Sequence, residues 1–178
     1  YKSDAFDLFL RATLPSADYR LSVENEPLGT GGAIQLACRG VTNENIAVAN
    51  GDTLFRVNIP VLSAFHHQQK ADCTIALKPM KAFSRYGAIT LNKDHSVKSF
   101  REKQYQAEGF INGGVYALNV PAFLGKRFPA KFSFEQEYLE RFYKGGKIFG
   151  ITEDAYFIDI GIPEDYKKAA AELTPGGN

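Results

Sequence analysis

The spacing of apolar side chains along this chain switches between the period of a helix and that of a strand, and the alternation predicts its elements. Phe6, Phe9 and Leu10 share one helical face after Ser3, whereas residues 19–23 alternate apolar and polar as in a half-buried strand. Ile46–Ala49 is wholly apolar, which is typical of a strand buried on both faces. The same patterns predict the remaining elements: helices over 33–39 and 58–69, a strand over 73–80, a hairpin over 88–103, a strand over 110–118, a helix from 133, strands around 149 and 157, and a helix from 163 to about 175.

Residues at the ends of these segments support the prediction. Asn58 can cap the helix that follows it, and Ser133 with Gln136 has the spacing of a capping box. Gly145 and Gly146 are expected to close that second helix. Strands and helices alternate in the first half and hairpins appear in the second, and there is no repeat or linker. We therefore expect an α/β fold with a mixed sheet, in a single domain over 1–178.

Composition narrows the class of protein. The 178 residues are 44% hydrophobic and 13% aromatic, which excludes a disordered chain. The chain has 21 basic and 20 acidic residues, so neither nucleic acid nor a membrane surface is an expected partner. No apolar run is long enough for a membrane span. Cys38 and Cys73 lie far apart, so no disulfide scaffold or zinc ribbon is expected and the cytoplasm is the predicted location.

A glycine-rich segment, Leu28-Gly29-Thr30-Gly31-Gly32, separates the strand predicted over 19–23 from the helix predicted after it. Glycines at the start of a helix let a ligand approach the backbone and offer N–H groups to acceptors, although a plain turn explains them equally well. The segment is not a dinucleotide fingerprint, because Ile34 stands where another glycine is required. This argues against a dehydrogenase.

Two aspartates follow apolar strands. Asp52 comes directly after the strand 46–49 and Asp159 is the only charged residue from 156 to 162. A pair of carboxylates from distant strand ends can hold one Mg²⁺ together with substrate phosphates. The alternative for Asp52 is a turn residue that binds its own backbone.

A basic and acidic pair, Glu102-Lys103, ends the predicted hairpin and is followed by Asn112. The lysine could neutralise a phosphate and the carboxylate could accept bonds from sugar hydroxyls, although a solvated strand end explains both residues. The adjacent histidines, His66 and His67, are interpreted as surface residues, and His95 as a solvated turn residue.

Taken in order, six motifs resemble those of the sugar-1-phosphate nucleotidylyltransferases, over the chain as far as about residue 170. They are Glu26-Pro-Leu-Gly-Thr-Gly-Gly32, Asn50-Gly-Asp52, Arg85-Tyr-Gly87, Phe100-Arg-Glu-Lys103, Ile111-Asn-Gly-Gly-Val-Tyr116 and Asp159-Ile-Gly-Ile-Pro-Glu-Asp-Tyr166. Residues 74–80 and Phe132-Ser-Phe-Glu135 further resemble the branch of guanylyltransferases that act on D-glycero-D-manno-heptose 1-phosphate.

The resemblance implies a Rossmann-like nucleotide-diphospho-sugar transferase fold, with a mainly parallel mixed sheet and helices on both faces. It implies that a nucleoside triphosphate and a sugar 1-phosphate react to give an NDP-sugar and pyrophosphate, in a possible homo-oligomer. The roles that it implies are Mg²⁺ ligation and catalysis by Asp52 and Asp159, phosphate binding and catalysis by Lys103, nucleotide binding by Leu28, Gly29, Thr30 and Gly31, and sugar binding by Gly87, Glu102 and Asn112.

Three other functions stay open at this point. Mannose-1-phosphate guanylyltransferases and amino-sugar-phosphate uridylyltransferases keep the chemistry with other substrates, and a regulatory subunit could bind a sugar nucleotide without turnover.

The sequence departs from the family pattern in two places. The family begins with a strand and a glycine-rich loop that hold the triphosphate, and no match to either is found, so an N-terminal βαβ portion is expected to be missing. Ile162 also replaces the threonine usual before Pro163. Loss of a capping hydroxyl costs about 1 kcal/mol in comparable helices.

Overall fold

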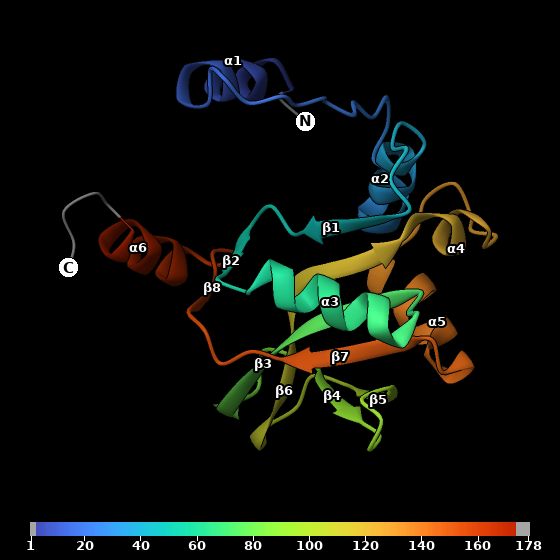
Figure 1. Ribbon diagram of the computed structural model, residues 1–178. Coiled ribbons are helices and arrows are strands. Elements are labelled where there is room, and N and C mark those ends of the chain that lie inside the picture. The colour runs from blue at the N-terminus through green and yellow to red at the C-terminus, as the bar shows by residue number, and fades with distance from the viewer. Residues whose placement is uncertain (1–2, 174–178) are drawn as a thin grey trace.

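The computed structural model describes residues 3–173, and its centre is a six-stranded mixed sheet (Figure 1). The strands of this sheet are β1 (Asn45–Ala49), β3 (Cys73–Phe83), β4 (Ala88–Leu91), β5 (Val97–Arg101), β6 (Gln106–Asn119) and β7 (Ile148–Thr152). Two short strands, β2 (Thr53–Phe55) and β8 (Phe157–Asp159), pair antiparallel with each other outside it.

The long strand β6 organises the sheet. Strand β3 follows one of its edges, while β1 and β4 share the other edge, and all three pair antiparallel with β6. Strands β1, β3 and β7 run in the same direction, but β3–β7 is the single directly bonded parallel pair among the described residues. The sheet is mixed as predicted. It is not mainly parallel, because β6 is inserted between β1 and β3.

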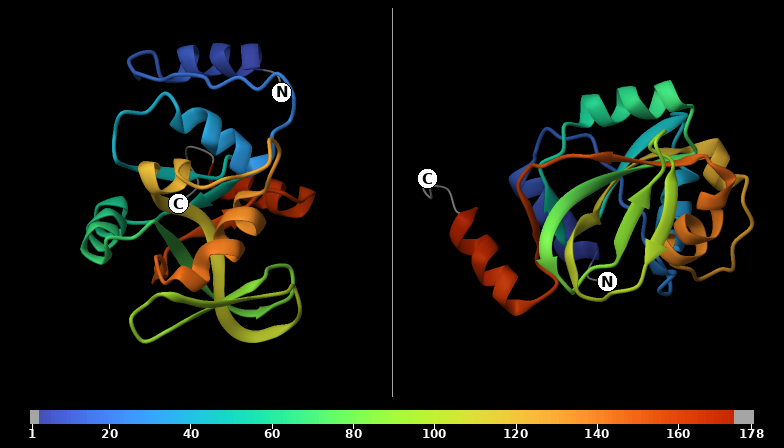
Figure 2. Two further views of the ribbon diagram at one scale, coloured as in Figure 1. Left: turned by 90° about the vertical axis from the view of Figure 1, so that its right-hand side faces the viewer. Right: turned by 90° about the horizontal axis from the view of Figure 1, so that it is seen from below.

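Helices cover both faces of the sheet, as expected (Figure 2). Helix α3 (Ile59–Gln69) lies on one face, and the other is covered by α2 (Gly29–Cys38), α4 (Val120–Leu124), the π-helix η1 (Phe134–Leu139), α5 (Glu140–Phe142) and the 3₁₀ turn η2 (Tyr143–Gly145). Two further helices, α1 (Ser3–Thr13) and α6 (Pro163–Glu172), lie at the periphery (Figure 1).

The core follows the alternation of side chains along the strands. Ile75 and Leu77 of β3 point into the larger hydrophobic cluster with Tyr116 of β6, whereas Ala76 between them faces the cluster that contains Leu62 of α3. Since successive side chains of a strand point to opposite faces, one sheet supplies both clusters. None of the helices within residues 3–173 combines the length and apolar character needed to cross a membrane.

Several predicted bounds are corrected. The predicted strand over 19–23 is absent, because no described strand lies beside this segment to accept its backbone hydrogen bonds, and its residues are largely exposed. The helix predicted over 33–39 begins earlier, at Gly29, so the glycine-rich segment forms its first turn. Helix α6 ends at Glu172, and the predicted stop at residue 175 lies outside the described residues.

The predicted caps are present. Asn58 Oδ1 accepts a hydrogen bond from Val61 N at 3.1 Å, and Ser133 Oγ accepts one from Gln136 N at 3.2 Å. In a capping box the side chain of Gln136 would accept a hydrogen bond from Ser133 N. Glu137 accepts it instead, with Ser133 N donating to Glu137 Oε2 at 2.6 Å. Ile162 provides no side-chain cap for α6, as expected.

Candidate functional site

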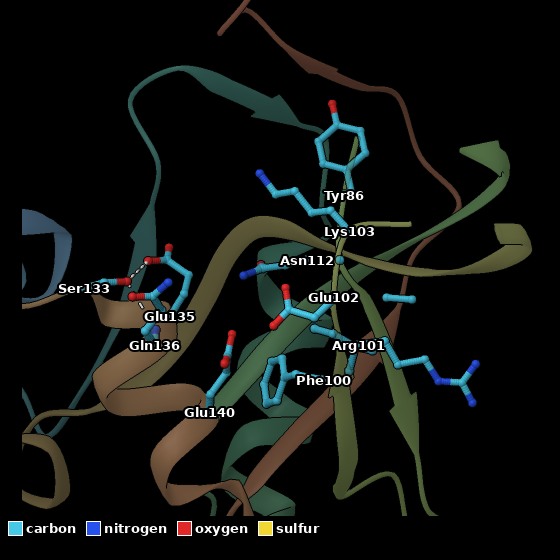
Figure 3. Close-up of a pocket in the computed structure, with 13 residues that line it drawn as sticks. Tyr86, Phe100, Arg101, Glu102, Lys103, Asn112, Ser133, Glu135, Gln136 and Glu140 are labelled. Carbon is cyan, nitrogen blue, oxygen red and sulfur yellow. Dashed lines mark hydrogen bonds between the residues drawn. The ribbon is translucent and has the colours of Figure 1, made fainter. Parts of the chain in front are cut away.

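A cavity of about 380 Å³ opens between the β4–β5 hairpin, strand β6 and the start of η1 (Figure 3). It brings together four residues predicted from three separate motifs, namely Gly87, Glu102, Lys103 and Asn112. The pairing of Ala88 with Arg101 places Gly87 beside Glu102. Gly87 packs so closely there that a Cβ would lie 2.7 Å from the carbonyl oxygen of Arg101. The hairpin therefore builds one wall of the cavity.

Asn112 is held at an irregularity in β6. The pairing with β3 shifts register between Ile75 and Leu77, and Gly114 accommodates the shift with a φ of 70°. Asn112 Nδ2 donates to Tyr116 Oη at 2.9 Å, and Asn112 Oδ1 accepts from Gly114 N at 3.0 Å. The amide thus has a fixed orientation in the cavity wall.

Residues that the sequence reasoning did not assign to the site form the opposite wall. Ser133, Glu135, Gln136 and Glu140 line the cavity from η1 and α5. Burial, together with the carboxylates of Glu102, Glu135 and Glu137, raises the pKa of Glu140. The sequence did contain a sign that these residues belong to the site. The capping box at Ser133 predicted that a helix begins within Phe132-Ser-Phe-Glu135, one of the segments that resemble the family.

Two cationic side chains border the cavity, and Figure 3 shows that they diverge. The guanidinium of Arg101 points away from the other labelled residues, whereas Lys103 extends toward the side of Tyr86. Lys103 is therefore better placed to meet a phosphate that enters from that side.

The predicted metal ligands lie at the same end of the β2–β8 pair, since Asp52 directly precedes β2 and Asp159 is the last residue of β8. Thr53 is the partner of Asp159 in this ladder, and Ile160 N donates to the carbonyl oxygen of Asp52 at 2.9 Å. The two aspartates are thus neighbours in space although more than 100 positions separate them in sequence.

Asp159 has the partners that its apolar surroundings called for. Its Oδ1 accepts from Gly161 N at 2.8 Å, and its Oδ2 accepts from Tyr86 Oη at 3.3 Å. Arg85 approaches the same carboxylate at 3.9 Å and binds Asp165 at 2.5 Å. Burial and the charge of Asp159 raise the pKa of Tyr86 to about 12, so its hydroxyl stays protonated and can donate. Tyr86 also lines the cavity and so connects it to Asp159.

Asp52 is exposed and accepts a hydrogen bond from Thr53 Oγ1 at 3.2 Å. It borders a second hollow, of about 310 Å³, whose other walls are mostly apolar side chains of β8 and α6. No cluster of three or more potential metal ligands occurs among the described residues. A pair of carboxylates is nevertheless a donor set that fits Mg²⁺, since this ion commonly takes one or two carboxylates and completes its shell with substrate phosphates and water.

The glycines of the predicted nucleotide segment pack against another part of the chain. A Cβ on Gly29 would lie 2.5 Å from Phe132 O, and one on Gly31 would lie 2.2 Å from the Phe132 ring. Gly29 also has a φ of 75°. Gly31 N donates to Phe132 O at 3.0 Å, so this N–H has a partner within the protein. Leu28 precedes them at the N-cap of α2, and its N donates to Glu24 Oε2 at 2.8 Å.

Thr30 lies in the same turn and points to the η1 segment. Its Oγ1 accepts from Phe134 N at 2.8 Å and donates to Glu135 Oε2 at 3.0 Å. The glycine-rich segment is therefore joined to a wall of the cavity.

The histidines lie away from this cavity. The prediction of a surface position is wrong for His66, which is 2% exposed, whereas His67 and His95 are exposed as expected. His66 bonds Thr74 through Nδ1 and Asn45 through Nε2, so it is a satisfied buried side chain. The buried face of α3 was predicted from its apolar residues alone. His66 lies one turn after Leu62 on that same face, and its burial was therefore missed.

Comparison with known proteins gives a consistent result. The sequence matches the Nucleotidyl transferase family over residues 7–175. The D-glycero-alpha-D-manno-heptose 1-phosphate guanylyltransferase of Aneurinibacillus thermoaerophilus is 47% identical, over 97% of this chain and 75% of its own length. The protein of the same name from Campylobacter jejuni is 39% identical, over 93% of this chain and 72% of its own.

Solved structures agree with the sequence match. HddC from Yersinia pseudotuberculosis superposes with a TM-score of 0.85 at 35% identity, over 98% of this chain and 76% of that one. A structure of HddC complexed with GMP-PN gives a TM-score of 0.84. The family match spans nearly the whole chain, and the fold and the order of the motifs agree with it. The chain is accordingly a nucleotidyltransferase and belongs to the Nucleotidyl transferase family.

Proposed function

We propose that the protein transfers the nucleotidyl group of GTP to D-glycero-D-manno-heptose 1-phosphate and releases pyrophosphate. The names of the two relatives support this choice of substrates. The observation that carries the proposal is the cavity, in which Gly87, Glu102, Lys103 and Asn112 meet and which Tyr86 connects to Asp159.

The arrangement suits binding of a sugar 1-phosphate. Glu102 can accept hydrogen bonds from sugar hydroxyls, and Asn112 presents an amide whose orientation is fixed by Tyr116 and Gly114. Lys103 can pair with the phosphate, which fits its extension toward Tyr86. Gly87 packs against the backbone of Arg101 and so forms part of the wall beside the sugar.

The reaction itself needs alignment more than covalent help from the protein. An oxygen of the sugar phosphate attacks the α-phosphorus of the nucleotide, a new P–O bond forms, and the bond to the departing pyrophosphate breaks. The attacking phosphate oxygen is already anionic, so no general base is required. Catalysis then comes from positioning and from neutralisation of charge, which Lys103 supplies in part.

Asp52 and Asp159 are the residues that we propose to hold Mg²⁺. When bound there with the polyphosphate, the ion would neutralise charge on the nucleotide. At the other end of the substrate, we propose that Leu28, Gly29, Thr30 and Gly31 border the nucleotide. We also propose that the protein works in the cytoplasm, where nucleoside triphosphates are available.

The test follows pyrophosphate release by the full-length protein with Mg²⁺, GTP and heptose 1-phosphate. We expect release by the wild type and a loss of at least about 100-fold in Asp52→Asn, because the variant loses a charged ligand at the phosphates. Asp154→Asn is the matched control. Asp154 is exposed and paired with Lys78, so this variant should stay within about two-fold of the wild type.

Two outcomes would overturn the proposal. One is a wild type that binds an NDP-sugar without releasing pyrophosphate, which would indicate a regulatory subunit. The other is undiminished release in Asp52→Asn. A panel with mannose 1-phosphate and GTP, and with an amino-sugar phosphate and UTP, tests the choice of substrate, for which we expect GTP and heptose 1-phosphate to give the highest kcat/KM.

A further inference from the structure

The glycine-rich segment and the start of η1 form a tight joint. Phe132 N donates to Leu28 O at 2.9 Å, and Gly31 N donates back to Phe132 O at 3.0 Å. The missing side chain of Gly31 leaves the place that the Phe132 ring occupies. Residues 28–31 and 132–135 are therefore packed against each other, although about 100 residues separate them in the sequence.

Glu135 is anchored at this joint by two hydroxyls. Thr30 Oγ1 and Ser133 Oγ each donate to its Oε2 at 3.0 Å. Each hydroxyl accepts in turn from a backbone N–H, of Phe134 for Thr30 and of Gln136 for Ser133. Because the backbone N–H groups donate and the carboxylate accepts, each hydroxyl directs its hydrogen at Glu135, and the orientation of this carboxylate is fixed.

The anchored carboxylate borders the cavity that is proposed to bind the sugar. Glu135 lines it with Ser133 and Gln136, opposite the wall made by Glu102 and Asn112 (Figure 3). Burial, with the charge of Glu135 as a smaller cause, raises the pKa of Tyr116, whose hydroxyl accepts from Asn112 Nδ2 at 2.9 Å. Thr30 is thus linked through Glu135 to the wall of the cavity that faces Asn112.

We propose that the side chain of Thr30 serves the sugar phosphate, as a positioning residue that acts through Glu135, while the backbone of residues 28–31 borders the nucleotide. The hydroxyl hydrogen of Thr30 is committed to Glu135, so it is not available to a nucleobase. Glu135 then presents a fixed acceptor to hydroxyls of the sugar. This inference rests on the proposed function and adds to it a residue for sugar recognition.

Kinetics with each substrate varied in turn test the inference. We expect Thr30→Val and Glu135→Gln each to raise the KM for the sugar 1-phosphate about ten-fold, while the KM for GTP stays within about two-fold of the wild type. Thr30→Ser keeps the hydroxyl and should restore the wild-type KM. The double variant Thr30→Val/Glu135→Gln should lose little more than either single variant, because both break one interaction.

Glu137→Gln is the matched control on the same helix. Its side chain bonds Ser133 N and does not line the cavity, so both KM values should stay near those of the wild type. A rise in the KM for GTP in Thr30→Val, or unchanged KM values in both variants, would overturn the inference while wild-type release of pyrophosphate upholds the proposed function. A wild type that releases no pyrophosphate would overturn both.

Discussion

The imidazole of His66 lies between α3 and the sheet and has a partner for each ring nitrogen. Nδ1 is 2.9 Å from Thr74 Oγ1, and Nε2 is 3.0 Å from Asn45 Oδ1. An amide oxygen only accepts, so Nε2 carries the hydrogen and Nδ1 accepts from the threonine. Burial, with a smaller contribution from the charge of His67 and an opposing one from Asp72, lowers the pKa of His66 to about 4. The residue is neutral in the folded protein.

The lowered pKa of His66 predicts a dependence of stability on pH. The unfolded chain binds a proton at His66 below about pH 6.5 and the folded one only near pH 4, so stability falls as pH decreases through this window. We expect the protonation of His66 to lower the free energy of unfolding by roughly 2 kcal/mol between pH 7 and pH 4.5, as measured by urea denaturation. The stability of His66→Gln should be lower at pH 7 but should change less over this range, and His67→Gln, which removes only the smaller contribution, should keep most of the wild-type slope. An equal slope in His66→Gln would contradict the assignment.

A second residue, Tyr138, is buried without a partner for its hydroxyl among the described residues. Its ring packs against several aromatic side chains, at centroid distances of 4.9 Å to Phe123 and 5.1 Å to Phe134. Removing an unpaired buried hydroxyl relieves a desolvation cost. Tyr138→Phe should therefore match or exceed the wild type in thermal stability, by up to about 1 kcal/mol.

Tyr116→Phe makes the same chemical change where the hydroxyl has a partner. Asn112 would lose its contact there, so we expect a loss of about 1 kcal/mol in the same thermal melts. A clear loss of stability in Tyr138→Phe would show that its hydroxyl has a partner after all.

At the scale of elements, the first turn of α2 shows why glycines stand where they do. Gly31 faces the ring of Phe132, and a methyl group at this position would overlap it. Gly31→Ala should destabilise the protein by about 2 kcal/mol, measured by thermal or urea unfolding. Gly145→Ala is the matched control, since nothing lies within 4 Å of a Cβ at Gly145, and it should leave stability almost unchanged. Equal effects of the two changes would contradict this role of Gly31.

Helix α6 shows how an element begins without a capping side chain. Ile162 offers no hydroxyl, but Pro163 occupies the first turn, where its missing N–H costs nothing. Glu164 and Asp165 place negative charge at the same end, where it is favourable, and Asp165 also binds Arg85. The departure from the family pattern at Ile162 is thus offset by neighbouring residues.

At the scale of the whole molecule, the cavity depends on which strands β6 joins. Its first half pairs with β4 and brings the hairpin next to Asn112, while its second half pairs with β1. Alternation of apolar residues predicted strands at these places but could not predict their partners, because pairing depends on segments far apart in sequence. The same limit explains why the sheet was expected to be mainly parallel, although β6 lies between β1 and β3.

The local features of this protein and the order of its motifs can be read from its sequence. The caps at Asn58 and Ser133, the β4–β5 hairpin and most helices follow from residues a few positions apart, so they could be predicted without a structure. Long-range packing sets which of these segments meet. It buried His66, left residues 19–23 without a partner among the described strands, and brought Glu135 and Glu140 to face Glu102. Contacts such as Thr30 with Glu135 join residues 105 positions apart, and only packing of the whole chain sets them.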